Sequence, residues 1–134
     1  GKQVPAEKRH VETTEMKWEV YPESIYHMIK KFSAYEKVKK IVITENGAAF
    51  KDVVESGRVH DIRRVDYYVK YLEQVLRAKK EGAKIDGYFA WSLMDNFEWA
   101  EGYAPRFGLV HVDFETQQRT IKDSGFWFRD FLKQ

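Results

Sequence analysis

The chain has 134 residues, of which 43% are hydrophobic, and this size and composition suit one domain with a core of its own. The 23 basic and 21 acidic residues leave a net charge of only +2, which argues against a polyanionic partner. The absence of cysteine excludes disulfides and thiolate metal sites, and no apolar run approaches the about 18 residues that span a membrane. We therefore expect a soluble, cytoplasmic protein that binds no nucleic acid or membrane and needs no metal or cofactor.

The first predicted element is a helix that follows a polar lead-in. Residues 1–17 lack hydrophobic periodicity and contain Pro5, which predicts a loop. Pro22 suits the first turn of a helix. The apolar residues after it are spaced by three and four positions, which predicts a helix over residues 22–35 with one buried stripe. The stripe consists of Ile25, Met28, Ile29 and Phe32.

A short β-branched run is the next element. Residues 40–44 read Lys-Ile-Val-Ile-Thr, which predicts a strand, and their unbroken apolar character suits burial on both faces of a parallel sheet. Asn46 and Gly47 end the strand in a turn, so Glu45 lies at its carboxyl end. In a barrel of parallel strands, active sites are built at that end. The alternative is that Glu45 is a solvated acid at a strand end.

A second helix is predicted downstream of this strand. Asp61 is expected to be its N-cap, and the aliphatic residues that follow alternate in steps of three and four. Lys79 and Lys80 suit its last turn and Gly82 its end, because cations and glycine are favoured at a helix C-terminus. The predicted core stripe consists of Ile62, Val65, Val69, Leu72 and Leu76.

Residues 85–91 predict a second buried strand, which runs into a loop rich in aromatic side chains, carboxylates and amides. A sugar ring presents C–H groups on its faces and hydroxyls around its edge. Indole rings can stack on those faces, and a carboxylate can accept paired hydroxyl hydrogen bonds. Trp91, Glu98 and Trp99 are therefore candidate sugar-binding residues. The alternative is an aromatic core cluster that carries acids, although buried acids need partners that a plain core lacks.

The remaining elements complete an alternating pattern of helices and strands. Residues 109–114 alternate between apolar and polar side chains, which predicts a short extended segment, and Asp123-Ser124 predicts the start of a last helix. The order of elements is typical of a βα repeat, so we predict an α/β fold with parallel strands. The sequence contains neither Gly-x-Gly-x-x-Gly nor Gly-x-Ser-x-Gly, which argues against a dinucleotide-binding unit and a serine hydrolase.

Six segments of the chain resemble segments of one known family in the same order. They are residues 18–22 (Trp-Glu-Val-Tyr-Pro), 43–47 (Ile-Thr-Glu-Asn-Gly), 58–61 (Arg-Val-His-Asp), 91–99 (Trp-Ser-Leu-Met-Asp-Asn-Phe-Glu-Trp), 106–110 (Arg-Phe-Gly-Leu-Val) and 122–124 (Lys-Asp-Ser). Together they resemble glycoside hydrolase family 1, the β-glucosidase family, over residues 16–132. The resemblance implies that residues 1–134, with 1–17 as a lead-in, form the C-terminal portion of a (β/α)8 TIM barrel, from about helix six to helix eight.

The resemblance also implies a reaction and a set of site residues. Enzymes of this family are retaining β-glycosidases, and Glu45 matches the catalytic nucleophile. Trp91 matches the platform that stacks on the glycone, Glu98 the acid that accepts two of its hydroxyls, and Trp99 an indole N–H donor to a neighbouring hydroxyl. Phe107 matches a ring that closes the glycone pocket. The implied substrate is a β-glucoside or a related disaccharide with a terminal β-D-glucosyl residue.

The chain departs from the family pattern in a way that bears on activity. The family's acid/base glutamate lies in an Asn-Glu-Pro motif, and no such motif occurs here. Two predicted strands are also too few for a barrel of eight, which typically needs about 250 residues. Our hypothesis is a nucleophile-bearing segment of a β-glucosidase, active only with the N-terminal part of the barrel. The alternative is a non-catalytic fragment that self-associates and at most binds sugar weakly.

Overall fold

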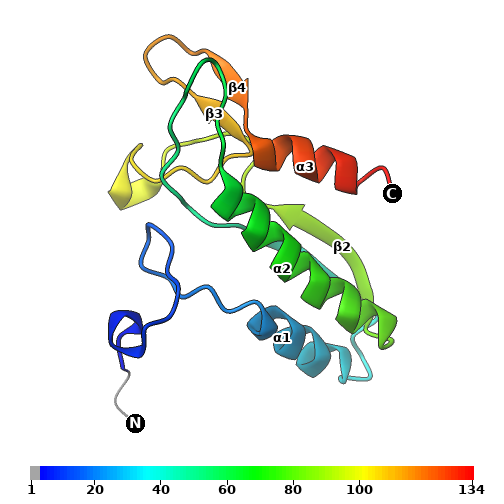
Figure 1. The fold of residues 1–134 in the computed structure, drawn as a ribbon. Helices are drawn as coiled ribbons and strands as arrows, with labels where there is room; N and C mark the ends of the chain where they lie inside the picture. Colours follow the sequence, from blue (N-terminus) through cyan, green and yellow to red (C-terminus); the bar gives the residue numbers. More distant parts are fainter. Residues whose placement is uncertain (1–3) are drawn as a thin grey trace.

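The computed structural model describes residues 4–134, which form a partial α/β unit (Figure 1). Within this range the elements are the 3₁₀ helix η1 (Ala6–Arg9), α1 (Glu23–Ser33), β1 (Ile41–Asn46), α2 (Ile62–Lys80), β2 (Ile85–Ala90), the 3₁₀ helix η2 (Trp99–Glu101), β3 (Val110–Val112), β4 (Arg119–Ile121) and α3 (Asp123–Phe131). The predicted parallel pairing is confirmed, since β1 and β2 run in parallel with Ile41 opposite Ile85. None of the helices in this range is long and apolar enough to cross a membrane.

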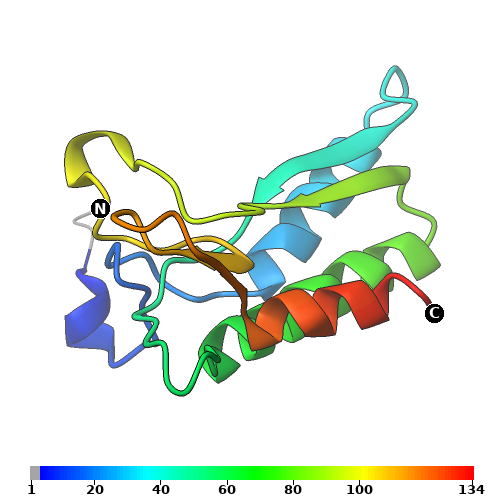
Figure 2. The same cartoon turned by 90° about the horizontal axis from the view of Figure 1, so that it is seen from above.

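The three α-helices form one layer on one side of the β1–β2 pair (Figure 2). α2 lies between α1 and α3 and contacts both of them. β3 and β4 form a separate antiparallel hairpin near the carboxyl ends of β1 and β2. This arrangement gathers the long connections that follow β1 and β2 at one end of the unit.

Only one face of the β1–β2 pair is covered. Ile41 and Ile43 of β1 pack against a buried cluster that includes Ile29 of α1. On the opposite face, Val42 is 43% exposed and Phe89 is 61% exposed. The prediction that the strand is buried on both faces is therefore wrong for this chain, because the described residues supply a helix layer on one side alone.

The buried face of α2 differs from the predicted stripe. Ile62 and Leu76 are 64% and 48% exposed, whereas Tyr67 and Tyr68 are buried in the core. Tyrosine adds a large apolar ring to a core, and its hydroxyl can find a hydrogen-bond partner at the core's edge. Arg64 is also buried on this face because carboxylates surround it. A stripe drawn through aliphatic residues alone therefore misplaced the buried face.

Several predicted boundaries also change. The helix predicted over residues 22–35 is shorter, and the strand predicted over residues 40–44 extends to Asn46, so Glu45 lies within β1. The predicted lead-in contains η1, and Thr13 forms an isolated bridge with Glu19; residues 1–3 of that prediction lie outside the described residues. The extended segment predicted over residues 109–114 is confirmed as β3, but its partner β4 was not predicted.

A cluster of buried charges lies between α2, the start of α3 and the loops at the carboxyl ends of β1 and β2. This buried ion cluster consists of Arg64, Arg106, Lys122, Asp52, Asp61 and Asp95. Its side chains are fully buried except that of Arg106, which is 21% exposed. Three cations thus face three anions, which gives each buried charge the partner that it needs.

Asp61 is the N-cap residue of α2 as predicted, but its side chain belongs to the buried ion cluster. No side-chain hydrogen bond closes the N-terminus of α2. The Asp61 carboxylate instead accepts hydrogen bonds from the backbone N–H and the hydroxyl of Ser124, in the first turn of α3, and pairs with Arg64. The carboxylate therefore joins α2 to α3, because a buried cation and a second helix compete for it more strongly than its own backbone does.

Asp95 is held ionised by its neighbours. Burial alone would raise the pKa of Asp95, but Lys122 and Arg106 outweigh burial and hold this pKa below its ordinary value. The carboxylate accepts hydrogen bonds from Lys122 Nζ at 2.8 Å, from the Arg106 guanidinium at 2.7 Å and from the Gly108 N–H at 2.9 Å. Because the folded pKa lies below the unfolded one, Asp95 stabilises the fold above its unfolded pKa, and this contribution is lost as the pH falls through the folded pKa.

We expect Asp95→Asn to lower the free energy of unfolding by about 3 kcal/mol near neutral pH, because Lys122 and Arg106 lose their shared anion. The difference from the unsubstituted chain should shrink in acid, as the pH falls below the ordinary Asp pKa of about 3.9 and through the lower folded pKa of Asp95. Denaturant unfolding at a series of pH values measures it. The control is Asp86→Asn, which removes an exposed partner of Lys40 and should cost less than about 1 kcal/mol. A difference for Asp95→Asn that stays constant into strong acid would contradict the prediction.

Candidate active site

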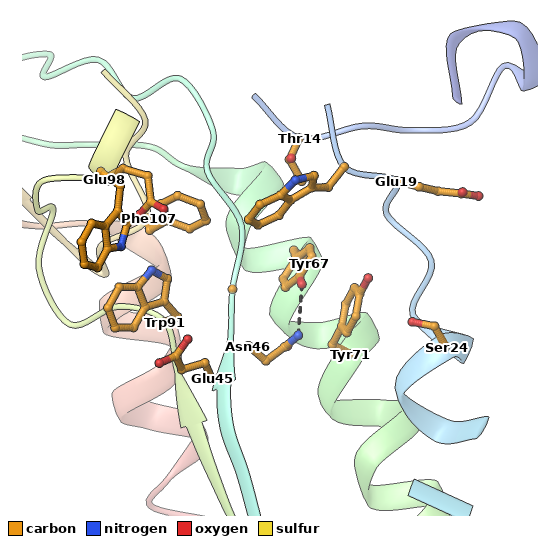
Figure 3. Close-up of a pocket in the computed structure, with 13 residues that line it drawn as sticks. Thr14, Glu19, Ser24, Glu45, Asn46, Tyr67, Tyr71, Trp91, Glu98 and Phe107 are labelled. Atoms are coloured by element: carbon orange, nitrogen blue, oxygen red, sulfur yellow. Dashed lines mark hydrogen bonds between the residues drawn. The ribbon is translucent and has the colours of Figure 1, made fainter. Parts of the chain in front are cut away.

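The carboxyl ends of β1 and β2 open into a cavity of about 610 Å³. Side chains converge on it from the end of β1, the loop after β2, one face of α2 and the segment before α1 (Figure 3). All five side chains predicted to form the site line this one cavity. The full lining consists of Thr14, Trp18, Glu19, Ser24, Glu45, Asn46, Gly47, Tyr67, Tyr71, Trp91, Glu98, Trp99 and Phe107.

Asn46 anchors the end of the strand that carries Glu45. In Figure 3, Glu45 points toward Trp91 and Asn46 points the other way, toward Tyr67, as successive strand residues do. The Asn46 side-chain N–H donates to the Tyr67 hydroxyl at 3.1 Å, and its carbonyl accepts from the Tyr88 hydroxyl at 2.7 Å. Burial raises the pKa of both tyrosines, so both stay protonated. Glu45 is therefore exposed to the cavity from an anchored backbone.

Gly47 allows the two sides of the cavity to approach each other. A Cβ atom at position 47 would lie 1.7 Å from the backbone carbonyl oxygen of Trp91. The Tyr68 hydroxyl donates to this carbonyl at 3.2 Å, and the Trp91 N–H donates to the Asn46 carbonyl at 2.8 Å. The backbone just after Glu45 therefore packs directly on the backbone of the predicted sugar platform.

The loop after β2 supplies an aromatic wall. Phe107 is only 3% exposed, whereas Trp99 is 82% exposed and lies at the rim. The backbone N–H of Glu98 donates to the Gly102 carbonyl at 2.7 Å, which closes the tight loop that presents Glu98 and Trp99. The Trp18 ring lies 6.0 Å from the Phe107 ring, so the aromatic wall continues onto the segment before α1.

Four of the aromatic and acidic lining residues were not predicted from the sequence, namely Trp18, Glu19, Tyr67 and Tyr71. Tyr67 and Tyr71 stack with their ring centroids 4.1 Å apart, and their spacing of four positions signals a shared helix face. That spacing does not show whether the shared helix face lines a cavity or packs into a core. Trp18 and Glu19 lie in residues 18–22, a segment that resembles the family. This resemblance was the sequence feature that could have identified them as lining residues.

Three carboxylates line the cavity, those of Glu19, Glu45 and Glu98. Glu19 pairs with Arg9 at 2.6 Å, and the hydrogen bond from this guanidinium lowers the pKa of Glu19. A carboxyl group that is held ionised is poorly suited to donate a proton to a leaving group. The pairing with Arg9 thus argues against Glu19 as a replacement for the acid of the absent Asn-Glu-Pro motif. In residues 4–134, no three His, Asp or Glu side chains are grouped so that they could hold a metal ion.

The sequence model of glycosyl hydrolase family 1 matches residues 1–134. This chain belongs to glycosyl hydrolase family 1. It is 52% identical to a 1,4-beta-D-glucan glucohydrolase of Thermotoga neapolitana and 51% identical to beta-glucosidase A of Thermotoga maritima, each over 127 residues. Among solved structures it resembles the family 1 β-glucosidase of Thermotoga maritima in complex with isofagomine lactam, with a TM-score of 0.91 and 51% identity.

The chain spans less than a third of the length of these family 1 relatives. The sequence alignments cover 94% of this chain but 29% and 28% of the two Thermotoga proteins, and the structural match covers 93% of this chain and 29% of its neighbour. The predicted family is confirmed. Family 1 β-glucosidases are TIM barrels, so the helices and strands described above correspond to part of such a barrel. The assignment to helices six to eight stays a prediction.

We expect Gly47→Ala to lower the free energy of unfolding by about 2 kcal/mol or more, because the new methyl group would collide with the Trp91 carbonyl and force the two strand ends apart. Gly82→Ala is the matched control. Gly82 has a φ of +87° but no heavy atom within 4 Å of an added Cβ, so this variant bears only backbone strain of about 1 kcal/mol. Denaturant unfolding of both variants measures the difference. Equal losses would contradict the role of the close approach.

Proposed function

We propose that this chain is the nucleophile-bearing part of a retaining β-glucosidase. One observation carries the proposal: Glu45, near the carboxyl end of β1, shares a single cavity with Trp91, Glu98, Trp99 and Phe107. The names of the two Thermotoga relatives, a glucan glucohydrolase and a beta-glucosidase, support the same class of reaction. The substrate is a terminal β-D-glucosyl residue of a β-glucoside or a related disaccharide.

Glu45 acts as the nucleophile in this proposal. Its carboxylate attacks the anomeric carbon, so that an ester bond forms while the bond from that carbon to the leaving oxygen breaks. The leaving oxygen takes up a proton from an acid outside this chain. Water then attacks the same carbon and gives up a proton to the now deprotonated group outside this chain, so that the ester bond breaks, the Glu45 carboxylate is freed and the sugar leaves with its configuration retained. A strand end anchored through Asn46 suits this step, because attack requires the reacting atoms to be held in line.

The aromatic wall binds the glycone. Trp91 stacks on a C–H face of the sugar, Glu98 accepts two hydroxyl hydrogen bonds, and the Trp99 indole N–H donates to a neighbouring hydroxyl. Phe107 closes the pocket. Within the described residues the lining contains three carboxylates and no lysine or arginine, so a phosphorylated sugar would meet like charges. The site therefore favours a neutral glycone.

The acid/base residue has to come from the N-terminal part of the barrel. The sequence lacks Asn-Glu-Pro, and loss of acid catalysis typically costs about 10²–10⁴-fold for a poor leaving group. The uncovered face at Val42 and Phe89 provides an apolar surface for that missing part. We expect the isolated chain to hydrolyse unactivated disaccharides little or not at all.

The second candidate is a non-catalytic fragment that self-associates. The same uncovered apolar face favours it, because strands with a bare face and free edges pair readily with other copies. Supplying the rest of a family 1 barrel separates the two functions. Activity appears only if this chain contributes a working nucleophile, whereas a fragment that merely self-associates stays inactive.

We expect an activated 2-deoxy-2-fluoro-β-glucoside to label Glu45 once the chain is combined with the remaining part of a Thermotoga maritima β-glucosidase A barrel. A good leaving group needs little acid help, and the fluorine slows hydrolysis of the ester, so that the covalent intermediate accumulates. Intact mass followed by peptide mapping measures the adduct and its position. Glu45→Gln should abolish labelling.

Glu101→Gln is the matched control for this experiment. Glu101 lies in η2 near the aromatic wall but does not line the cavity, so labelling should persist in this variant. A folded assembly that gains no adduct, or gains it on another residue, would refute the proposed role of Glu45.

A further inference from the structure

The buried ion cluster joins the two chain segments that form the two sides of the cavity. One side is the end of β1 with the irregular segment 47–52 after it, and the other is the loop 91–109 after β2. Neither segment continues as a regular strand, so the positions of their side chains depend on contacts made outside the β1–β2 ladder. The buried ion cluster provides such contacts to both segments.

Arg64 of α2 holds the first segment and reaches the second. Its guanidinium donates to the carbonyls of Ala48 at 3.3 Å and Phe50 at 3.4 Å and pairs with Asp52 at 2.9 Å. It also donates to the backbone carbonyl of Arg106 at 2.6 Å, in the loop after β2. One fully buried side chain therefore touches the backbone on both sides of the cavity.

Lys122 joins the two segments a second time. Its Nζ donates to Asp52 at 2.5 Å in the first segment and to Asp95 at 2.8 Å in the second. Asp95 lies in the same loop as Glu98 and also accepts from the backbone N–H of Gly108. Asp52 and Asp95 thus share one buried cation, and the distance between their segments follows from the size of that bridge.

We propose that Asp95 and Lys122 are positioning residues that set the distance between Glu45 and the sugar-binding residues Trp91 and Glu98. This inference rests on the proposed function, in which Glu45 attacks a sugar held by Trp91 and Glu98, so that the spacing between the two sides of the cavity matters. Charge-assisted hydrogen bonds have fixed directions and lengths, so they fix geometry as well as energy. Apolar side chains of similar volume often match a buried ion network in stability, so the specific contribution of this network is geometric.

Hydrogen exchange on the full chain tests the positioning role directly. Lys122→Met keeps the length of the side chain and removes its charge. We expect amide protection to fall by at least about tenfold more in residues 47–52 and 91–109 than in residues 67–78 of α2, because local openings have their own free energies. Lys40→Met is the matched control: Lys40 pairs with Asp86 near the other end of β1 and β2 and is 70% exposed, so its loss should leave both segments unchanged.

Asp95→Asn is a second variant, with an almost unchanged side-chain volume, for the case in which Lys122→Met does not fold. In either variant, a larger loss of protection in the two segments than in α2 supports the proposal. Protection lost equally in α2 in both variants would mean that the cluster stabilises the fold as a whole, and the proposal would be wrong. Unchanged protection in both segments would overturn it as well.

The kinetics of labelling by the activated fluoroglucoside provide the functional readout, in the assembly with the remaining barrel. We expect Lys122→Met to lower the second-order labelling rate by about 100-fold, because displacement by about 1 Å can cost this much. Most of the loss should appear as weaker sugar binding, since the aromatic loop loses its anchor. Unchanged labelling in a variant with a loosened loop would refute the positioning role. If the unsubstituted assembly is not labelled, the proposed function fails, and hydrogen exchange still decides the positioning.

Discussion

The buried ion cluster is the interaction on which the rest of this unit depends. Six charged side chains, almost all without solvent contact, lie where α2, α3 and both site loops meet. An unpaired charge at this depth would be strongly unfavourable, so all members have to be present together. Because the partners come from distant parts of the sequence, each pair fixes one segment against another. The buried ion cluster thus fixes the segments at the irregular end of the unit, and the β1–β2 ladder fixes those at the regular end.

The candidate site combines these two kinds of constraint. Glu45 lies in β1 between the paired residues Ile43 and Asn46. Asn46 ties this strand end to Tyr67 and Tyr88. The aromatic wall belongs to the loop that Asp95 anchors through its hydrogen bonds with Lys122 and the Gly108 N–H. Contact between Gly47 and the Trp91 carbonyl joins the two parts without any intervening side chain. A retaining mechanism needs such a junction, because the carboxylate and the sugar platform must keep one separation through both chemical steps.

Much of the fold and of the candidate site could be predicted from local sequence signals. The remaining features depend on how the helices, strands and loops pack together. The β-branched run before Glu45 and the spacing of Ile25 and Ile29 identified β1 and α1, because each pattern reports its own element. The pairing of Asp61 with Ser124 could not be predicted, since its partner lies 63 positions away and competes with local capping. The family resemblance identified the aromatic residues of the loop after β2. Tyr67 and Tyr71 were not predicted, because they line the cavity only through the packing of α2 beside the end of β1.

The position of Lys122 in the chain has a consequence for synthesis. A ribosome releases the chain from its N-terminus, so Asp52 and Asp95 emerge before the lysine that they share. Until Lys122 follows, two carboxylates that are buried in the finished fold remain hydrated, and the aromatic loop lacks its anchor. The helices can gather around the tyrosines of α2 before that moment, whereas the loop becomes ordered only afterwards. The aromatic wall is therefore among the last features of this unit to form on the ribosome.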